Sequence, residues 1–255
     1  MSWDVMVLLA AAGLLAGVAN ALAGGGTLIT FPAMLAAGLP PIVANASNAV
    51  AVTPGHFIAA IADRQKIPPL SGRFLLFVAT ALLAGFAGAM LLLVTPSGLF
   101  TLLVPPLIGM ATLIFAMSER IEATVTRWRG STAKASGAAE AALLIGPAAI
   151  YGGYFGAGLG VMLMAVLAVT GMNDIRGASA VKNVLATAVS IATIVTFASR
   201  DVISWAETSV MLCGAVSGGL LGGHLIRILP AMLVRRIIIA VGTLMTMIYA
   251  AKYWL

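Results

Sequence analysis

Long apolar runs, separated by short charged or proline- and glycine-rich breaks, fill almost the whole chain. Residues 5–62 contain no Asp, Glu, Lys or Arg, and neither do residues 74–118. Water cannot solvate such stretches, whereas lipid can, provided that the backbone pairs with itself as helix. The pattern therefore predicts an all-α integral membrane protein with about 8–10 membrane segments.

The apolar segments form two sets of the same design on either side of a polar connector. Each set has a glycine-interrupted segment, a short piece and three longer helices. The predicted segments are 5–22, 27–37, 42–62, 74–94 and 99–117, then 138–157, 161–170, 175–198, 205–226 and 231–254. We interpret residues 1–118 and 137–255 as two membrane repeats joined by a cytoplasmic connector, residues 119–136. The alternative is that Gly- and Ala-rich membrane helices resemble one another by composition alone.

Loop charge indicates how the repeats are oriented. Lys and Arg concentrate in residues 64–73, in the connector and in residues 227–236, whereas the turn 95–98 has none. The positive-inside tendency places these three basic loops in the cytoplasm. The loop after the third element is basic in the first repeat and nearly neutral in the second, and the next loop shows the reverse. This exchange predicts that the two repeats are inverted relative to each other.

Composition narrows the class of protein further. Hydrophobic residues make up 61% of the chain and charged residues 9%, whereas a soluble domain has about a quarter of its residues charged. The residues that give the formal charge of +6 lie in short segments between apolar runs. This placement is typical of cytoplasmic loops that face anionic lipid, and it argues against nucleic-acid binding. Asp4 stands where a signal peptide would be basic, so we expect the first helix to belong to the mature protein.

Two glycine-rich interruptions, at matching places in the two sets, are the predicted binding site. A half-helix that starts after a break presents free N–H groups and the positive end of its dipole, and glycine lets a ligand approach that backbone closely. Two such ends facing each other would form an anion cradle. The candidates are Gly24, Gly25, Gly26 and Thr27 in the first interruption and Gly158 and Gly160 in the second. Alternatively, the glycines only permit close helix packing.

Polar residues inside the apolar segments add further candidates. If a helix begins at Ile175, Lys182 lies two turns inside it, where a charge is expected to meet an anion or a wet cavity; otherwise it snorkels to the interface. Asn20 is expected to cap a half-helix or bind a substrate oxygen. His56 is either a proton carrier or a kink histidine bonded to the backbone. The polar residues expected to orient the substrate are Asn45, Asn48 and Asn183.

The same glycine motifs carry a family resemblance over nearly the whole chain. The run Gly-Gly-Gly-Thr-Leu-Ile-Thr-Phe-Pro at 24–32 and the run Tyr-Gly-Gly-Tyr-Phe-Gly-Ala-Gly-Leu-Gly at 151–160 resemble the paired signatures of the TauE/SafE anion transporters. The resemblance implies a multi-pass carrier in a bacterial inner membrane for sulfite, sulfonates, sulfoacetate or taurine-like compounds. Val166 stands where the first motif has Pro32, which puts equal roles for the two half-helices in doubt.

The expected mechanism is that of a secondary carrier. Amides at the glycines hold the anion, Lys182 supplies charge, and one repeat moves against the other. No cofactor, metal or catalytic residue is expected, the coupling ion is H+ or Na+, and the oligomeric state is left open. A passive channel and a membrane assembly subunit are the alternatives. An intramembrane enzyme is disfavoured, because Ser217 and His224 are separated by two helical turns, about 10 Å.

Overall fold

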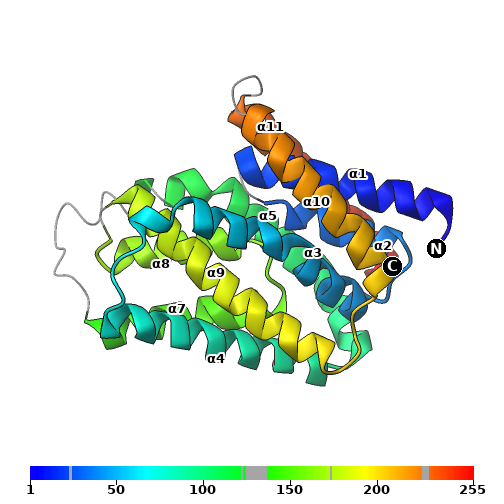
Figure 1. The fold of residues 1–255 in the computed structure, drawn as a ribbon. Helices are drawn as coiled ribbons and strands as arrows, with labels where there is room; N and C mark the ends of the chain where they lie inside the picture. Colours follow the sequence, from blue (N-terminus) through cyan, green and yellow to red (C-terminus); the bar gives the residue numbers. More distant parts are fainter. Residues whose placement is uncertain (23–24, 122, 125–136, 173, 226–229) are drawn as a thin grey trace.

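The computed structural model describes residues 1–255 except 23–24, 122, 125–136, 173 and 226–229 (Figure 1). The described residues form helices and contain no strand. The helices are α1 (Trp3–Leu22), α2 (Thr27–Ala36), α3 (Pro41–Ala62), η1 (Arg64–Lys66), α4 (Gly72–Val94), α5 (Ser97–Ala116), α7 (Ala138–Tyr154), α8 (Leu159–Val169), α9 (Ile175–Ala198), α10 (Trp205–Leu225) and α11 (Ala231–Trp254). Most of the predicted connector lies outside the described residues.

Helix length and hydropathy confirm the prediction of an all-α membrane protein. Five of the described helices, α1, α4, α5, α9 and α11, are long and apolar enough to cross a membrane. The 23 residues of α4 correspond to about 35 Å of helix, enough for a hydrocarbon core of about 30 Å. The short helices α2 and α8 have 10 and 11 residues, which correspond to only about half of that thickness.

Local sequence explains where the helices begin and end. The Asp174 carboxylate caps α9 by accepting bonds from the amides of Arg176 and Gly177. Helix α9 therefore begins at Ile175, and Lys182 lies two turns inside it, as its assumed start predicted. The ends of α2 and α8 are also alike. Leu39 N–H donates to Met34 O at 3.3 Å, and Met172 N–H donates to Leu167 O at 3.2 Å, the bond that closes a Schellman motif.

The tightest helix pairs join the predicted repeats to each other. Figure 1 shows α1 beside α10 at one end of the molecule and α4 beside α7 at the other. Between α1 and α10, a Cβ at Gly13 would collide with Met211 O, and a Cβ at Gly218 would collide with Leu14 O. The α4–α7 pair is built in the same way, since a Cβ at Gly88 would collide with Ile150 O. Glycine thus lets each pair approach backbone to backbone.

The helix contacts between the two predicted repeats follow the same pattern in both directions. Each tight pair joins the first helix of one repeat to the fourth element of the other, while α3 contacts its counterpart α9 and α5 contacts its counterpart α11. This pattern agrees with a duplicated core. The inverted orientation of the repeats in the membrane stays a prediction.

Buried apolar side chains form two cores, and neither core coincides with one repeat. The larger core draws most of its residues from α1, α2, α3, α5, α10 and α11, with Phe31, Phe100 and Phe115 among its large members. The buried residues of the second core come from α4, α7, α8 and α9. The described residues among the predicted binding residues lie on or next to α1, α2, α3, α8 and α9, and α3 contacts α9 where the two groups of helices meet.

Candidate functional site

The first interruption separates α1 from α2 and is held by its own side chains. Gly25 adopts a left-handed conformation, with φ of +81°, that turns the chain between the two helices. Gly26 N–H donates to Asn20 Oδ1 at 2.8 Å, and Thr30 Oγ1 donates to Gly26 O at 3.2 Å. The structure therefore places Asn20 as a cap for the second half-helix. Gly24 lies outside the described residues.

Close packing surrounds the first interruption. A Cβ at position 26 would lie 2.7 Å from Asn20 Nδ2 and 2.8 Å from Ala16 O. A Cβ at position 25 would lie 2.9 Å from the ring of Phe115. Thr27, the first residue of α2, is half-buried. Gly25 and Gly26 thus allow close packing here, as the alternative interpretation of the motif expects, and the Gly26 amide is already bonded. A role of this interruption in substrate binding stays a prediction.

The second interruption, between α7 and α8, is more open. Gly158 has φ of +82° and stands immediately before the first residue of α8. The nearest atom to a Cβ at this position would be a methyl of Ile114, 3.7 Å away. Tyr151 Oη donates to Ala157 O at 2.8 Å, so the side chain that spans this break bonds to a carbonyl and not to an amide. At the start of α8, Leu159 N–H donates to Gly156 O at 3.2 Å and Val161 N–H donates to Gly158 O at 3.0 Å.

Lys182 lies against the start of α8. A Cβ at Gly160 would be 3.8 Å from Lys182 Cδ, which is its nearest neighbour outside the helix backbone. His56, on α3, is within electrostatic range of Lys182. Gly55 links this group to the first interruption, because a Cβ there would lie 3.9 Å from Asn20 Nδ2. Helix α3 thus connects the cap of α2 with the lysine beside α8.

The predicted asparagines are buried. Asn45, Asn48 and Asn183 are 2%, 1% and 5% exposed. Asn45 Nδ2 donates to Tyr154 O, the carbonyl of the last residue of α7, at 2.9 Å. The Oδ1 atoms of Asn45 and Asn48 are buried and have no hydrogen-bond partner. Counted from the first residues of their helices, Pro41 and Ile175, Asn48 and Lys182 both stand eighth.

Aromatic residues join the two interruptions, and the sequence interpretation missed their role. The ring of Phe31 on α2 packs edge-to-face against Phe155 in the second interruption, with centroids 5.1 Å apart. The ring of Tyr151 also packs against Phe155, with centroids 6.4 Å apart. The signal was the Tyr and Phe residues inside the second glycine motif. Side chains this large next to a break provide contacts that the break itself lacks.

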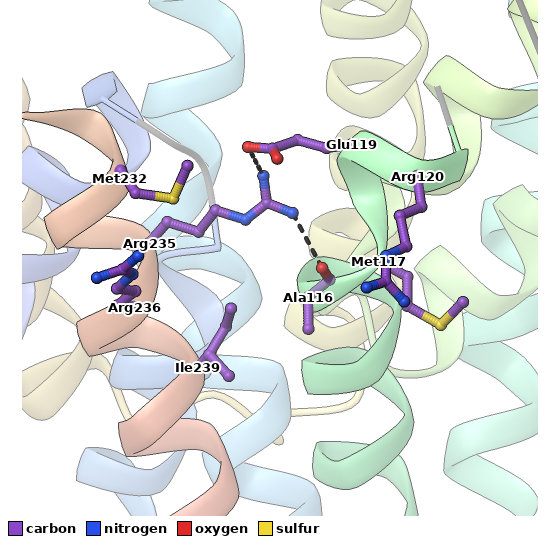
Figure 2. Close-up of a pocket in the computed structure, with 8 residues that line it drawn as sticks. All are labelled: Ala116, Met117, Glu119, Arg120, Met232, Arg235, Arg236 and Ile239. Atoms are coloured by element: carbon purple, nitrogen blue, oxygen red, sulfur yellow. Dashed lines mark hydrogen bonds and ion pairs between the residues drawn. The ribbon is translucent and has the colours of Figure 1, made fainter. Parts of the chain in front are cut away.

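An arginine on α11 supports the helix that carries Phe115. Figure 2 shows Arg235 extending from α11 to Glu119, with which it forms an ion pair, and to the carbonyl of Ala116 at 3.0 Å. The same guanidinium donates to Phe115 O at 3.2 Å. A pocket of about 430 Å³ lies beside this junction, and none of the predicted binding residues lines it. Arg235 therefore fixes the end of α5, against which Gly25 packs.

Comparisons with known proteins agree with one another. Residues 9–249 match the model of the family described as Sulfite exporter TauE/SafE. A probable membrane transporter protein of Haemophilus influenzae is 28% identical over 246 residues, which cover 95% of this chain and 93% of that protein. The probable membrane transporter protein YfcA of Escherichia coli K12 is 28% identical over 235 residues, which cover 91% of this chain and 85% of that protein. No solved structure matches the chain.

Proposed function

The chain belongs to the sulfite exporter TauE/SafE family, and from this premise we propose that it is a secondary carrier of small organosulfur anions in the bacterial inner membrane. Family and fold make it a multi-pass membrane transporter, and the expectation that it is not an enzyme is confirmed. The proposed substrates are sulfite, sulfonates, sulfoacetate or taurine-like compounds, which share a compact head of negatively charged oxygens.

The contact between Lys182 and the start of α8 is the observation that carries this proposal. A charge inside a membrane helix costs about 2.5–3.5 kcal/mol on insertion scales, so a lysine two turns inside α9 marks a functional site. Its stem lies 3.8 Å from the Cβ position of Gly160, in the first turn of a half-helix. A positive side chain and a positive helix end at one place favour an anion.

We assign the two interruptions unequal roles in binding. The amides near Gly158 and Gly160 bind substrate oxygens directly, and Lys182 balances their charge. Asn183 follows Lys182 on α9 and is proposed to orient the substrate. Because Asn20 occupies the Gly26 amide, the first interruption, with Gly25 and Thr27, does not provide a second equal cradle.

His56 is the candidate for coupling through a proton. A bound anion beside Lys182 would offset the repulsion between that lysine and a protonated imidazole, so substrate and proton would favour each other's binding. The packing of α3, which carries His56, against α9, which carries Lys182, supports this role.

Direct binding measurements test the substrate class. Purified protein is titrated calorimetrically with sulfite, taurine, hypotaurine, sulfoacetate and an aryl sulfonate, with phosphate as the control anion. Binding of at least one organosulfur anion in preference to phosphate is expected. Equal or absent binding of all six compounds would contradict the proposal.

Transport in liposomes separates the carrier from the alternatives. A carrier shows saturable uptake that is driven by an ion gradient. A passive channel shows flux that follows the anion gradient alone and does not saturate in the same range. An assembly subunit shows no flux.

A further inference from the structure

Two buried amide oxygens on α3 stand without partners. Asn45 and Asn48 are 2% and 1% exposed, and the Oδ1 atom of each is buried and makes no hydrogen bond. The residues are three apart, so their side chains lie on the same face of α3, with Cβ atoms about 5–6 Å apart. A buried carbonyl oxygen without a donor is unfavourable, and two of them side by side indicate a ligand that accepts their lone pairs.

The end of α7 lies next to this pair. Asn45 Nδ2 donates to Tyr154 O at 2.9 Å, which fixes the amide with its nitrogen toward the last residue of α7. The C-terminal end of a helix carries the negative end of the dipole and carbonyls that lack helical partners. Neutral oxygens and a negative helix end together favour a cation. The start of α8 and Lys182, on the other side of the interruption, favour an anion.

We propose that Asn45 Oδ1 and Asn48 Oδ1, on the face of α3 that Asn45 joins to the end of α7, bind a sodium ion. Two oxygens that share one ion stand within about 5 Å of each other, twice the distance of about 2.4 Å that is usual for hard cations and oxygen ligands. Among the described residues, no group of three His, Cys, Asp or Glu side chains gathers to hold a metal. A ligand set of neutral oxygens without carboxylates suits a monovalent ion better than Ca²⁺ or Mg²⁺.

The position of the ion would couple it to the substrate. This step rests on the proposed function, because it places the anion at the start of α8. The two half-helix ends that flank the second interruption would then bind opposite charges, which attract each other across a short stretch of backbone. Each ion would increase the affinity for the other by the same factor.

Thermal stability in defined salts tests the ion site without substrate. Full-length protein in detergent is heated in NaCl, KCl or choline chloride at equal ionic strength, so that chloride is constant. Sodium alone should raise the Tm, by about 3–5 °C at saturation, because it binds the folded state. The same Tm in all three salts would overturn the proposal.

Variants at Asn48 locate the ion. Asn48→Leu keeps the side-chain volume and should lose the sodium-specific rise in Tm, whereas Asn48→Asp should reach it at lower sodium concentration. Thr53→Val is the matched control, because it removes an α3 hydroxyl that is bonded within its own helix to Ala49 O, and it should keep the full rise. A full sodium effect in Asn48→Leu would place the ion elsewhere and refute the assignment.

Substrate binding keeps this test separate from that of the carrier. The same titrations with organosulfur anions are repeated in NaCl and in choline chloride. Binding that is tighter in sodium, and equal in both salts for Asn48→Leu, is expected. Substrate binding without any sodium effect would refute the ion site and leave the carrier intact. A sodium effect on Tm without binding of any organosulfur anion would support the ion site and refute the proposed carrier function.

Discussion

The two interruptions use the same sequence device in different ways. Both turn the chain with a left-handed glycine, and in both a side chain from the preceding helix spans the break to the backbone six residues further on. In the first, Asn20 Oδ1 accepts from the Gly26 amide. In the second, Tyr151 Oη donates to the Ala157 carbonyl. The first bond consumes the kind of group that binds an anion, and the second does not.

Packing follows the same division. A Cβ at Gly26 would come within 2.8 Å of a main-chain oxygen, whereas a Cβ at Gly160 would meet only the stem of Lys182 at 3.8 Å. Duplicated motifs therefore do not imply duplicated roles. The first interruption is filled by its own side chains, and the more open second one, beside Lys182, is the one that we propose binds the anion.

Removal of the lysine at the second interruption should have the largest effect. Lys182→Ala is expected to weaken binding of the organosulfur anion by at least about 100-fold, or about 3 kcal/mol, because the anion loses its charged partner. Calorimetric titration measures the loss. Lys66→Ala, which removes an exposed lysine from η1, is the control and should bind normally. Unchanged affinity in Lys182→Ala would remove Lys182 from the site.

Alanine at one glycine of each interruption should separate stability from binding. Gly26→Ala should destabilise the protein by about 1–3 kcal/mol, because the new methyl overlaps Asn20 and Ala16 O. Gly160→Ala should keep the wild-type Tm but weaken substrate binding about tenfold, or about 1.4 kcal/mol, because the methyl covers the start of α8. Thermal melts and titrations of both variants decide. The reverse pattern would show that the first interruption is the binding one.

Loss of the cap at the first interruption should have a moderate effect on stability alone. Asn20→Leu removes the acceptor for the Gly26 amide and should cost about 1 kcal/mol, with substrate affinity nearly unchanged. Asn20→Asp keeps an accepting oxygen at a helix N-terminus and should be the more stable of the two. A large drop in affinity for Asn20→Leu at unchanged Tm would instead make Asn20 a substrate ligand.

The smallest effect is expected from the bond that braces the second interruption. Tyr151→Phe keeps the ring against Phe155 and removes only the bond to Ala157 O, so a loss of about 0.5–1.5 kcal/mol is expected. Tyr249→Phe removes a similar bond, to Pro32 O at 3.1 Å, and provides the comparison by thermal melt. If Tyr151→Phe lowers substrate affinity much more than Tyr249→Phe does, the brace also shapes the binding amides.

The sequence predicts most of the helices because lipid imposes a simple rule. A mainly apolar run long enough to cross the hydrocarbon must be helical, so the segments predicted at 42–62, 74–94 and 175–198 agree with α3, α4 and α9 to within two residues at each end. Glycine clusters likewise located both interruptions. Helix α7 ends at Tyr154, three residues before the predicted end at 157, because the motif does not reveal which glycines adopt the positive φ.

Side-chain partners were beyond the sequence. Asn20 lies six residues before Gly26, a separation at which a broken helix can place the two anywhere, so its bond depends on the turn at Gly25. Contacts between distant segments, such as Asn45 with Tyr154 and Phe31 with Phe155, depend on how the repeats interlock. Motif spacing within one repeat carries no information about these contacts.

The close glycine contacts between α1 and α10 and between α4 and α7 limit how the helices can move during transport. Because the two backbones of each pair are in direct contact, with no side chains between them, each pair is expected to move as a rigid body. If one repeat moved as a rigid body against the other, the α1–α10 and α4–α7 contacts would both have to break. The hinge is therefore expected to lie between the α1–α10 pair and the α4–α7 pair. Each moving unit would then contain helices from both repeats.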